Sequence, residues 1–130
     1  MLDWRLPAAA LLGSAMLVGA LPDVASASLT PRLYWTEGTI ARAGLDGTAV
    51  NHSLVLGASA PYGIAVDGQH IYWANESVGT IGRANLDGTN VDESFITGAS
   101  NPIELAVDAQ HIYWTNLANG TIGRANVDGT

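Results

Sequence analysis

From residue 33 onward, short runs of β-branched and aromatic residues alternate with Gly, Asp and Asn, and no segment keeps a helical period. Ile103, Leu105 and Val107 alternate with polar or small residues, as expected for a strand with one buried face. Comparable runs predict four strands in one unit, at 70–75, 80–86, 91–97 and 102–108. The pattern therefore predicts an all-β chain of short antiparallel strands.

The pattern recurs with a constant spacing, marked by Arg42, Arg83 and Arg124. An aromatic pair precedes each arginine, and the three pairs are Tyr34-Trp35, Tyr72-Trp73 and Tyr113-Trp114. Such a period indicates units that bury their apolar faces only against one another. Four short antiparallel strands in about 40 residues form a β-propeller blade. The sequence thus predicts about two and a half blades of an incomplete ring, with repeats at about 33–71, 72–112 and 113–130.

Aspartates mark the predicted turns. Asp87-Gly88 joins the second and third strands of the full unit, and Asp-Gly favours a tight hairpin in which both central residues adopt positive φ. We expect each turn aspartate to accept a hydrogen bond from the backbone N–H two residues later. The turn aspartates are Asp46, Asp67, Asp87, Asp108 and Asp128. The Asp-x-Asp-x-Asp spacing of a calcium loop is missing, so no metal site is predicted.

The repeated side chains are expected to be structural. The Tyr-Trp pairs offer the largest apolar area in each unit and should pack between successive sheets. Gly82 and Ala84 share one face of their strand and should let an adjacent sheet approach closely. The repeated arginines should pair with a carboxylate or lie across the next blade, the alternative being an anion-binding stripe. His70 and His111 are interpreted as polar residues that leave a turn, rather than as metal ligands.

Residues 1–27 have the features of a signal peptide, and residues 28–130 are expected to form the fold. Arg5 gives a weakly positive start, and the apolar stretch 6–21 follows. Ala25 and Ala27 place small residues where a signal peptidase acts, which predicts cleavage after Ala27. Because the apolar stretch is shorter than the ~20 residues of a membrane span, we expect a secreted, extracellular chain without stable membrane insertion.

Charge and cysteine content exclude several classes of function. The chain contains 5 Lys or Arg and 12 Asp or Glu, for a formal net charge of −7. Without a basic patch, it is not expected to bind nucleic acid or anionic lipid. The chain has no Cys, which excludes disulfides, thiol chemistry and Cys-based zinc sites. Stability must therefore come from apolar burial and strand pairing.

Four segments carry a resemblance to a known family: IYWAN (71–75), IYWTN (112–116), GRANLDGT (82–89) and PYGIAVDGQHIYW (61–73). They resemble the YWTD repeats, or class B repeats, of low-density lipoprotein receptors and their bacterial relatives, over residues 33–130. In that family six repeats close into a six-bladed propeller, and the repeated motif is structural rather than catalytic. The resemblance implies structural roles for the aromatic pairs, the repeated arginines, Asn75, Asn116, Asp87 and Gly88.

The chain departs from that family in three ways. The acidic end of the motif is replaced by Asn75 and Asn116, although the first copy keeps Glu37. The Gly of the Pro-x-Gly strand is Gly63 in one repeat and Glu104 in the next. Only about two and a half repeats are present, so we interpret the chain as a fragment of a bacterial-type secreted relative. The alternative is a short chain that assembles its ring from two or three copies or stacks as an open array.

The functional prediction is a secreted, non-catalytic interaction module that binds protein or glycan and needs no cofactor. No Ser nucleophile elbow, phosphate loop or His-Glu metal helix occurs in the sequence. Self-association through open sheet edges is a further expectation. Two alternatives remain: a propeller enzyme of the streptogramin lyase or gluconolactonase type with its catalytic residues in missing blades, and a nonfunctional gene remnant.

Overall fold

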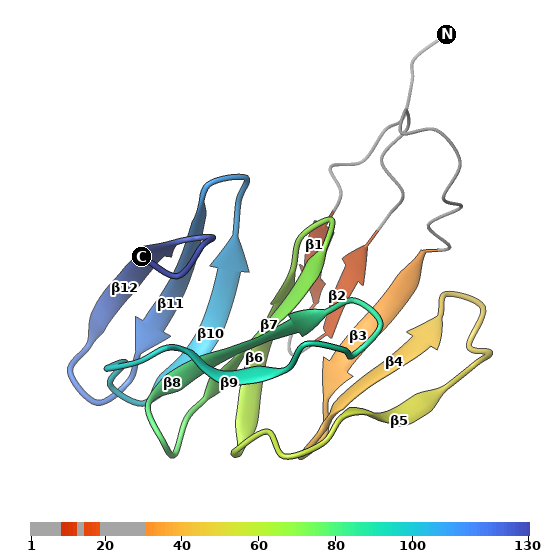
Figure 1. Ribbon diagram of the computed structural model, residues 1–130, viewed down its shortest axis with the longest axis horizontal. Helices are drawn as coiled ribbons and strands as arrows, with labels where there is room; N and C mark the ends of the chain where they lie inside the picture. Colours follow the sequence, from red (N-terminus) through yellow and green to blue (C-terminus); the bar gives the residue numbers. More distant parts are fainter. Residues whose placement is uncertain (1–8, 13–14, 19–30) are drawn as a thin grey trace, which may run out of the picture.

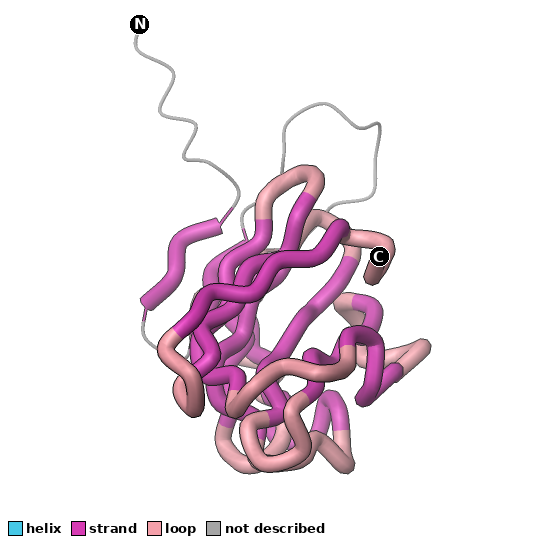
Figure 2. Tube along the Cα trace, turned by 90° about the vertical axis from the view of Figure 1, so that its left-hand side faces the viewer, coloured by secondary structure: helices cyan, strands magenta, loops and turns pink. Residues whose placement is uncertain are grey.

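A computed structural model describes residues 9–12, 15–18 and 31–130, and in these residues it contains strands and turns without a helix (Figures 1 and 2). Accordingly, this part of the chain offers no helix that could cross a membrane. The strands are β1 (Ala9–Leu12), β2 (Ala15–Val18), β3 (Arg32–Thr36), β4 (Ile40–Gly44), β5 (Asn51–Val55), β6 (Pro61–Val66), β7 (His70–Asn75), β8 (Thr80–Asn85), β9 (Asp92–Ile96), β10 (Pro102–Val107), β11 (His111–Asn116) and β12 (Thr121–Asn126). The expected all-β class and the four predicted strand positions are confirmed.

The strands form three antiparallel sheets that stand side by side (Figure 1). The first sheet has the order β1-β2-β3-β4-β5, the second β6-β7-β8-β9 and the third β10-β11-β12. The second sheet has the four antiparallel strands of a propeller blade. In the other two sheets the aromatic strand, β3 or β11, likewise lies between the strand that precedes it and the strand that follows it in the sequence. The chain therefore has the architecture of a partial β-propeller.

The sheets are out of phase with the sequence repeats. The strand at 102–108, expected to complete the unit that begins at residue 70, instead opens the third sheet as β10. Leu105 of β10 pairs with Trp114 of β11, just as Ile64 of β6 pairs with Trp73 of β7. Each short turn before an aromatic strand thus closes a hairpin within one sheet, whereas the segment after β9 crosses to the next sheet.

Part of the predicted signal peptide joins the first sheet. β2 pairs with β3 in antiparallel register, with Leu17 opposite Leu33, and β1 pairs with β2. This differs from the expectation that residues 1–27 lie outside the fold, because β2 fills the position next to the aromatic strand that β6 and β10 occupy in their sheets. Pairing with β2 satisfies the N–H and C=O groups along the edge of β3. The predicted cleavage site after Ala27 lies outside the described residues.

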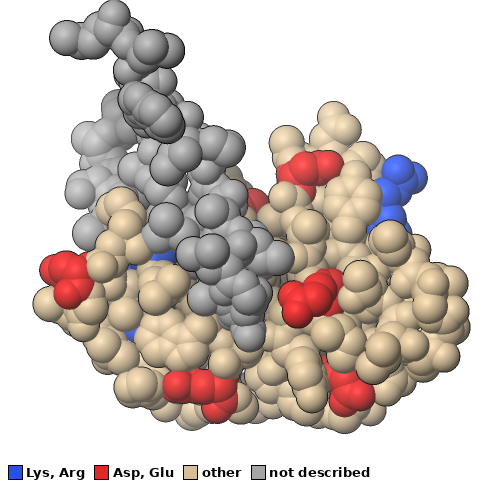
Figure 3. Space-filling model, turned by 180° about the vertical axis from the view of Figure 1, so that it is seen from behind, with Lys and Arg blue, Asp and Glu red and all other residues tan. Residues whose placement is uncertain are grey.

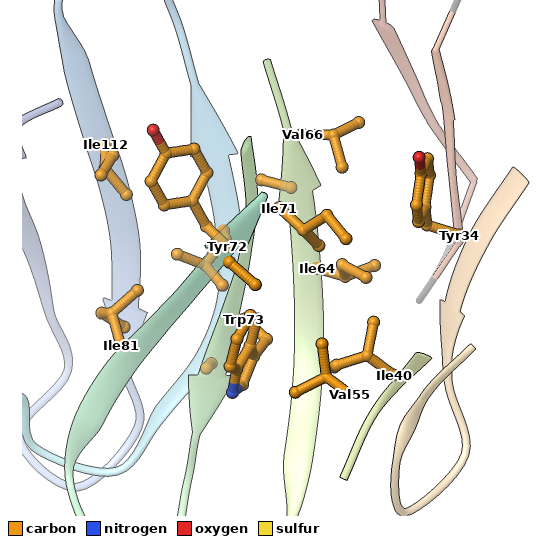
Figure 4. Packing of buried hydrophobic residues seen from close by; sticks show 14 of the residues in the cluster. Tyr34, Ile40, Val55, Ile64, Val66, Ile71, Tyr72, Trp73, Ile81 and Ile112 are labelled. Carbon is orange, nitrogen blue, oxygen red and sulfur yellow. The ribbon is translucent and has the colours of Figure 1, made fainter. Parts of the chain in front are cut away.

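The core lies between the sheets, where Tyr and Trp of each aromatic pair point to opposite faces (Figure 4). Tyr34 and Ile40 of the first sheet face the second sheet, which presents Ile64 and Trp73. All four side chains are nearly or fully buried. The predicted packing between successive sheets is therefore present for Tyr34, Tyr72, Trp73 and Trp114, whereas Trp35 and Tyr113 are only partly buried.

Gly82 makes room for an indole ring rather than for a neighbouring sheet. A Cβ at this position would lie 2.3 Å from Cε2 of Trp73, the residue opposite it on β7. Gly123 has the same relation to Trp114, where the corresponding distance is 2.1 Å. The expected close approach is thus real, but it comes from the same sheet.

The five turn aspartates accept the predicted hydrogen bonds from the backbone N–H two residues later. The acceptors are Asp46, Asp67, Asp87, Asp108 and Asp128, at N–O distances of 2.7–3.0 Å. The expected hairpin geometry at Asp87-Gly88 is wrong, because only Gly88 has positive φ. Gly68 lies outside the positive-φ region, which explains why Ala109 takes its place in the next repeat.

Candidate functional site

Asn75 fastens three segments of the second sheet. It ends β7 and is fully buried. Its Oδ1 accepts the N–H of Ser59 at 3.0 Å, and its Nδ2 donates to Thr80 Oγ1 at 3.1 Å and to the Glu93 carbonyl at 3.0 Å. The linker before β6, the start of β8 and the strand β9 are thereby held together.

Asn116 repeats this arrangement in the third sheet. Its Oδ1 accepts the N–H of Ser100 at 2.9 Å, and its Nδ2 donates to Thr121 Oγ1 at 3.0 Å. The same Oδ1 also accepts the indole N–H of Trp114 at 3.0 Å. In both sheets, the amide that ends the motif therefore binds the threonine that begins the following strand and the backbone of the linker that leads into the sheet.

The first sheet carries Glu37 at the equivalent position. Its Oε2 accepts the indole N–H of Trp35 at 2.9 Å, and its Oε1 lies 2.7 Å from Nδ1 of His52. The hydrogen bond from Trp35, followed by that from His52, lowers the pKa of the Glu37 carboxyl. His52 is itself largely exposed. Glu37 thus takes the position that a buried asparagine occupies in the other two sheets, but its side chain is exposed.

The repeated arginines occupy equivalent strand positions but have different partners. Arg42 Nη1 and the Tyr34 hydroxyl both donate to the carbonyl of Leu86 at 3.0 Å, which connects the first sheet to the second. The guanidinium of Arg83 instead lies 3.8 Å from the ring centroid of Phe95 in its own sheet. Arg124 lies on β12 opposite Tyr113.

These contacts refine the predicted roles. Arg42 makes the expected contact with the next blade, but through a backbone carbonyl rather than a carboxylate. Sequence reasoning missed Phe95 and Glu93. The Glu93 carboxylate accepts the indole N–H of Trp73 at 3.1 Å. Phe95 and Glu93 belong to β9, whose sequence has no close counterpart in the other repeats, so the period held no signal for them.

An Asp-His-Tyr cluster stands at the turn between β6 and β7. Asp67 Oδ1 accepts the N–H groups of Gln69 and His70, and its Oδ2 accepts the Tyr72 hydroxyl at 2.9 Å. His70 Nδ1 is 3.7 Å from the same carboxylate. Burial, with a further contribution from the negative charge of Asp67, raises the pKa of Tyr72 well above its usual range.

The turn between β10 and β11 repeats this cluster. Asp108 accepts the N–H groups of Gln110 and His111 and the hydroxyl of Tyr113 at 3.1 Å. The backbone hydrogen bonds from Gln110 and His111 lower the pKa of Asp108. The two clusters belong to neighbouring sheets, which places like groups side by side at one end of the molecule.

A groove of about 320 Å³ lies at this end of the second and third sheets. Its walls include Asp67, Gln69, His70, Tyr72, Asp108 and Val127. Within residues 31–130, no three His, Asp or Glu side chains converge on a point where a metal ion could bind. Both carboxylates already accept backbone and tyrosine hydrogen bonds. The groove also contains other polar side chains, such as Gln69 and His70, that can form hydrogen bonds with a partner, and it is called here the rim groove.

Acidic side chains are spread over the face shown in Figure 3, with few basic side chains among them. This distribution agrees with the net charge of −7. An acidic surface favours solubility and disfavours nonspecific binding to polyanions.

No protein family and no curated protein matches the chain. Among solved structures, the chain is similar to one described as the crystal structure of a nidogen/laminin complex. The two chains are 30% identical with a TM-score of 0.71, and the match covers 78% of this chain and 42% of that one. The chain thus spans less than half of its structural relative. The similarity supports a β-propeller of the YWTD type.

Proposed function

We propose that the protein is a non-catalytic interaction module of the β-propeller type that binds another protein. The observation that carries this proposal is the similarity to a chain solved in the nidogen/laminin complex. The repeated polar residues also support it, since Asn75, Asn116 and Arg42 are engaged in holding blades together. Groups engaged in this way are poorly placed to take part in chemistry.

The rim groove is the proposed contact surface. It groups donors and acceptors from two blades, including the half-buried imidazole of His70. Turns at the ends of rigid sheets are common positions for recognition residues. A protein loop could bind there through hydrogen bonds, and the hydroxyls of a glycan would find the same partners, which keeps glycan binding within the proposal.

The test measures binding of the full chain to immobilised laminin and to a glycan panel by interferometry. Saturable binding that weakens at least tenfold in the variant His70→Ala is expected, because His70 lines the groove. His52→Ala serves as the control, because this histidine lies away from the groove and should leave binding unchanged. Absence of saturable binding to both probes would overturn the proposal, and stoichiometric divalent metal with lyase or lactonase turnover would replace it with an enzyme.

We further propose that the chain is exported and acts outside the cell. The support is the leader-like composition of residues 1–27, with Ala25 and Ala27 before the predicted cleavage point. Amino-terminal sequencing of the protein from a secreting host should then start at Ser28. A mature product that retains residues 1–27 would contradict export by a cleaved signal peptide.

Self-association through a sheet edge is also proposed. Within residues 31–130, no strand pairs with the outer edge of β12. An unpaired edge presents N–H and C=O groups that another chain can bind. Arg124→Pro would test the idea, because the equivalent Arg83 pairs with the outer strand of its own sheet. Proline removes a backbone donor from that edge and should reduce edge-mediated association.

A further inference from the structure

Successive sheets meet through two complementary faces. We define the forward face of a sheet as the one that carries the Tyr of the aromatic pair, and the rear face as the one that carries the Trp. The forward face of the first sheet, with Tyr34 and Ile40, packs on the rear face of the second, with Trp73 (Figure 4). The forward face of the second, with Tyr72 and Ile81, packs toward Ile112 of the third.

The forward face of the third sheet has no such cover among the described residues. Ile40 and Ile81 have no exposed surface, whereas Ile122, at the equivalent position of β12, is 75% exposed. Ile122 and Leu117 line a cleft of about 360 Å³ together with Ile103. Leu117 is also 68% exposed. An apolar patch of this kind marks an interaction surface.

The rear face of the first sheet is the matching surface. Trp73 and Trp114 are at most 8% exposed, because the preceding sheet covers each of them. Trp35, at the equivalent position of β3, is only partly buried, as is Leu33 beside it. The backbone carbonyl equivalent to that of Leu86, which accepts from Arg42 and Tyr34, belongs on the first sheet to Leu45.

We propose that the forward face of the third sheet binds the rear face of the first sheet in a second copy of this chain. The contact would be of the same kind as the two contacts already made inside the chain. It is a head-to-tail contact, which yields a closed ring when the rotation per sheet fits and an open filament when it does not. It is independent of the rim groove and of the outer edge of β12.

The number of sheets favours a dimer over a larger ring. The described residues of each chain form three sheets. Propellers close with roughly four to eight blades, so two copies fall within that range and three copies exceed it.

The test is the molar mass of the full chain by light scattering and sedimentation velocity at micromolar concentrations. A species of twice the chain mass of 13.5 kDa is expected. Ile122→Arg should raise the dissociation constant at least 50-fold, since it places a charge in the apolar contact. Its side chain is already exposed within one chain, so this variant should keep its circular dichroism spectrum and thermal midpoint.

Val78→Arg is the matched control. Val78 is 57% exposed and lies in the turn between β7 and β8 of the second sheet, which supplies neither of the two proposed faces. The control should remain a dimer. A monomeric wild-type chain, an open polymer, or a dimer that survives Ile122→Arg would each overturn the proposal, the last by assigning association to another surface such as the edge of β12.

Discussion

Glycine and tryptophan act as a pair on the central strands. Gly82 and Gly123 lie opposite Trp73 and Trp114, and each glycine leaves the space in which the indole ring packs. The first sheet has Ala41 at this position, opposite the less buried Trp35. The glycine therefore leaves room for the ring within its own sheet, and the preceding sheet covers the ring from the other side.

Gly82→Ala should lower the free energy of unfolding by about 1–3 kcal/mol, because the new Cβ would overlap the buried indole of Trp73. Gly68→Ala is the control. Nothing lies within 4 Å of a Cβ there, and Ala109 already occupies the equivalent turn position, so a change within about 0.5 kcal/mol is expected. Urea unfolding followed by circular dichroism measures both. Equal effects of the two substitutions would contradict this account of Gly82.

Asn75→Ala should lower the free energy of unfolding by about 2–3 kcal/mol, because it leaves the N–H of Ser59 without its partner and removes one of the two donors to the Glu93 carbonyl, the other being the Thr80 hydroxyl. Asn126→Ala removes an exposed amide whose bond is to Thr130 within one turn, and should cost much less. Thermal melts of both variants make the comparison. A small loss for Asn75→Ala would show that water readily replaces the amide.

At the scale of strands and turns, local signals were sufficient for prediction. The alternation of Ile103, Leu105 and Val107 located β10, and the turn aspartates formed the expected bonds. The grouping of strands into sheets was not predictable, because a repeated sequence can be divided at any point and only strand pairing fixes the boundary. Glu93 and Phe95 were missed for a related reason, since their contacts depend on β9 lying beside β8.

The turn aspartates should make stability depend on acid. Backbone and threonine hydrogen bonds lower the pKa values of Asp46, Asp87 and Asp128 below the ordinary value of 3.8. A pKa lowered by folding stabilises the protein above the unfolded value, and this contribution is lost as pH falls through the lower, folded value. The thermal midpoint should therefore change little between pH 7 and about pH 5 and fall below about pH 4.

Asp87→Asn isolates one of these turns. The amide oxygen can still accept from the N–H of Thr89, but it does not titrate in this range. The variant should lose less of its thermal midpoint than the wild type between pH 5 and pH 3, as measured by melts in matched salt. An identical acid profile would place the pH dependence in other carboxylates.

At the scale of the whole molecule, the first strands of the second and third sheets, β6 and β10, determine how closely these two sheets can approach. A Cβ on Gly63 of β6 would lie 2.4 Å from the carbonyl oxygen of Ile103 and 2.7 Å from Cα of Glu104, both on β10. The second and third sheets therefore approach closely only because residue 63 is glycine. β10 carries Glu104 at the equivalent position, so the next sheet of a ring must stay farther away there.

The difference between Gly63 and Glu104 allows a further test of the proposed dimer. In a ring of two copies of the full chain, which keeps residues 1–27, Glu104 would meet β2, the strand beside β3 in the partner's first sheet. Glu104→Gly should therefore allow closer packing and lower the dissociation constant about fivefold. Glu104→Gln is the matched control, because it removes the charge but keeps the bulk, and it should leave the constant nearly unchanged. Sedimentation velocity over a concentration series measures all three chains. If Glu104→Gln tightened the dimer as much as Glu104→Gly, repulsion between charges rather than steric bulk would limit the contact.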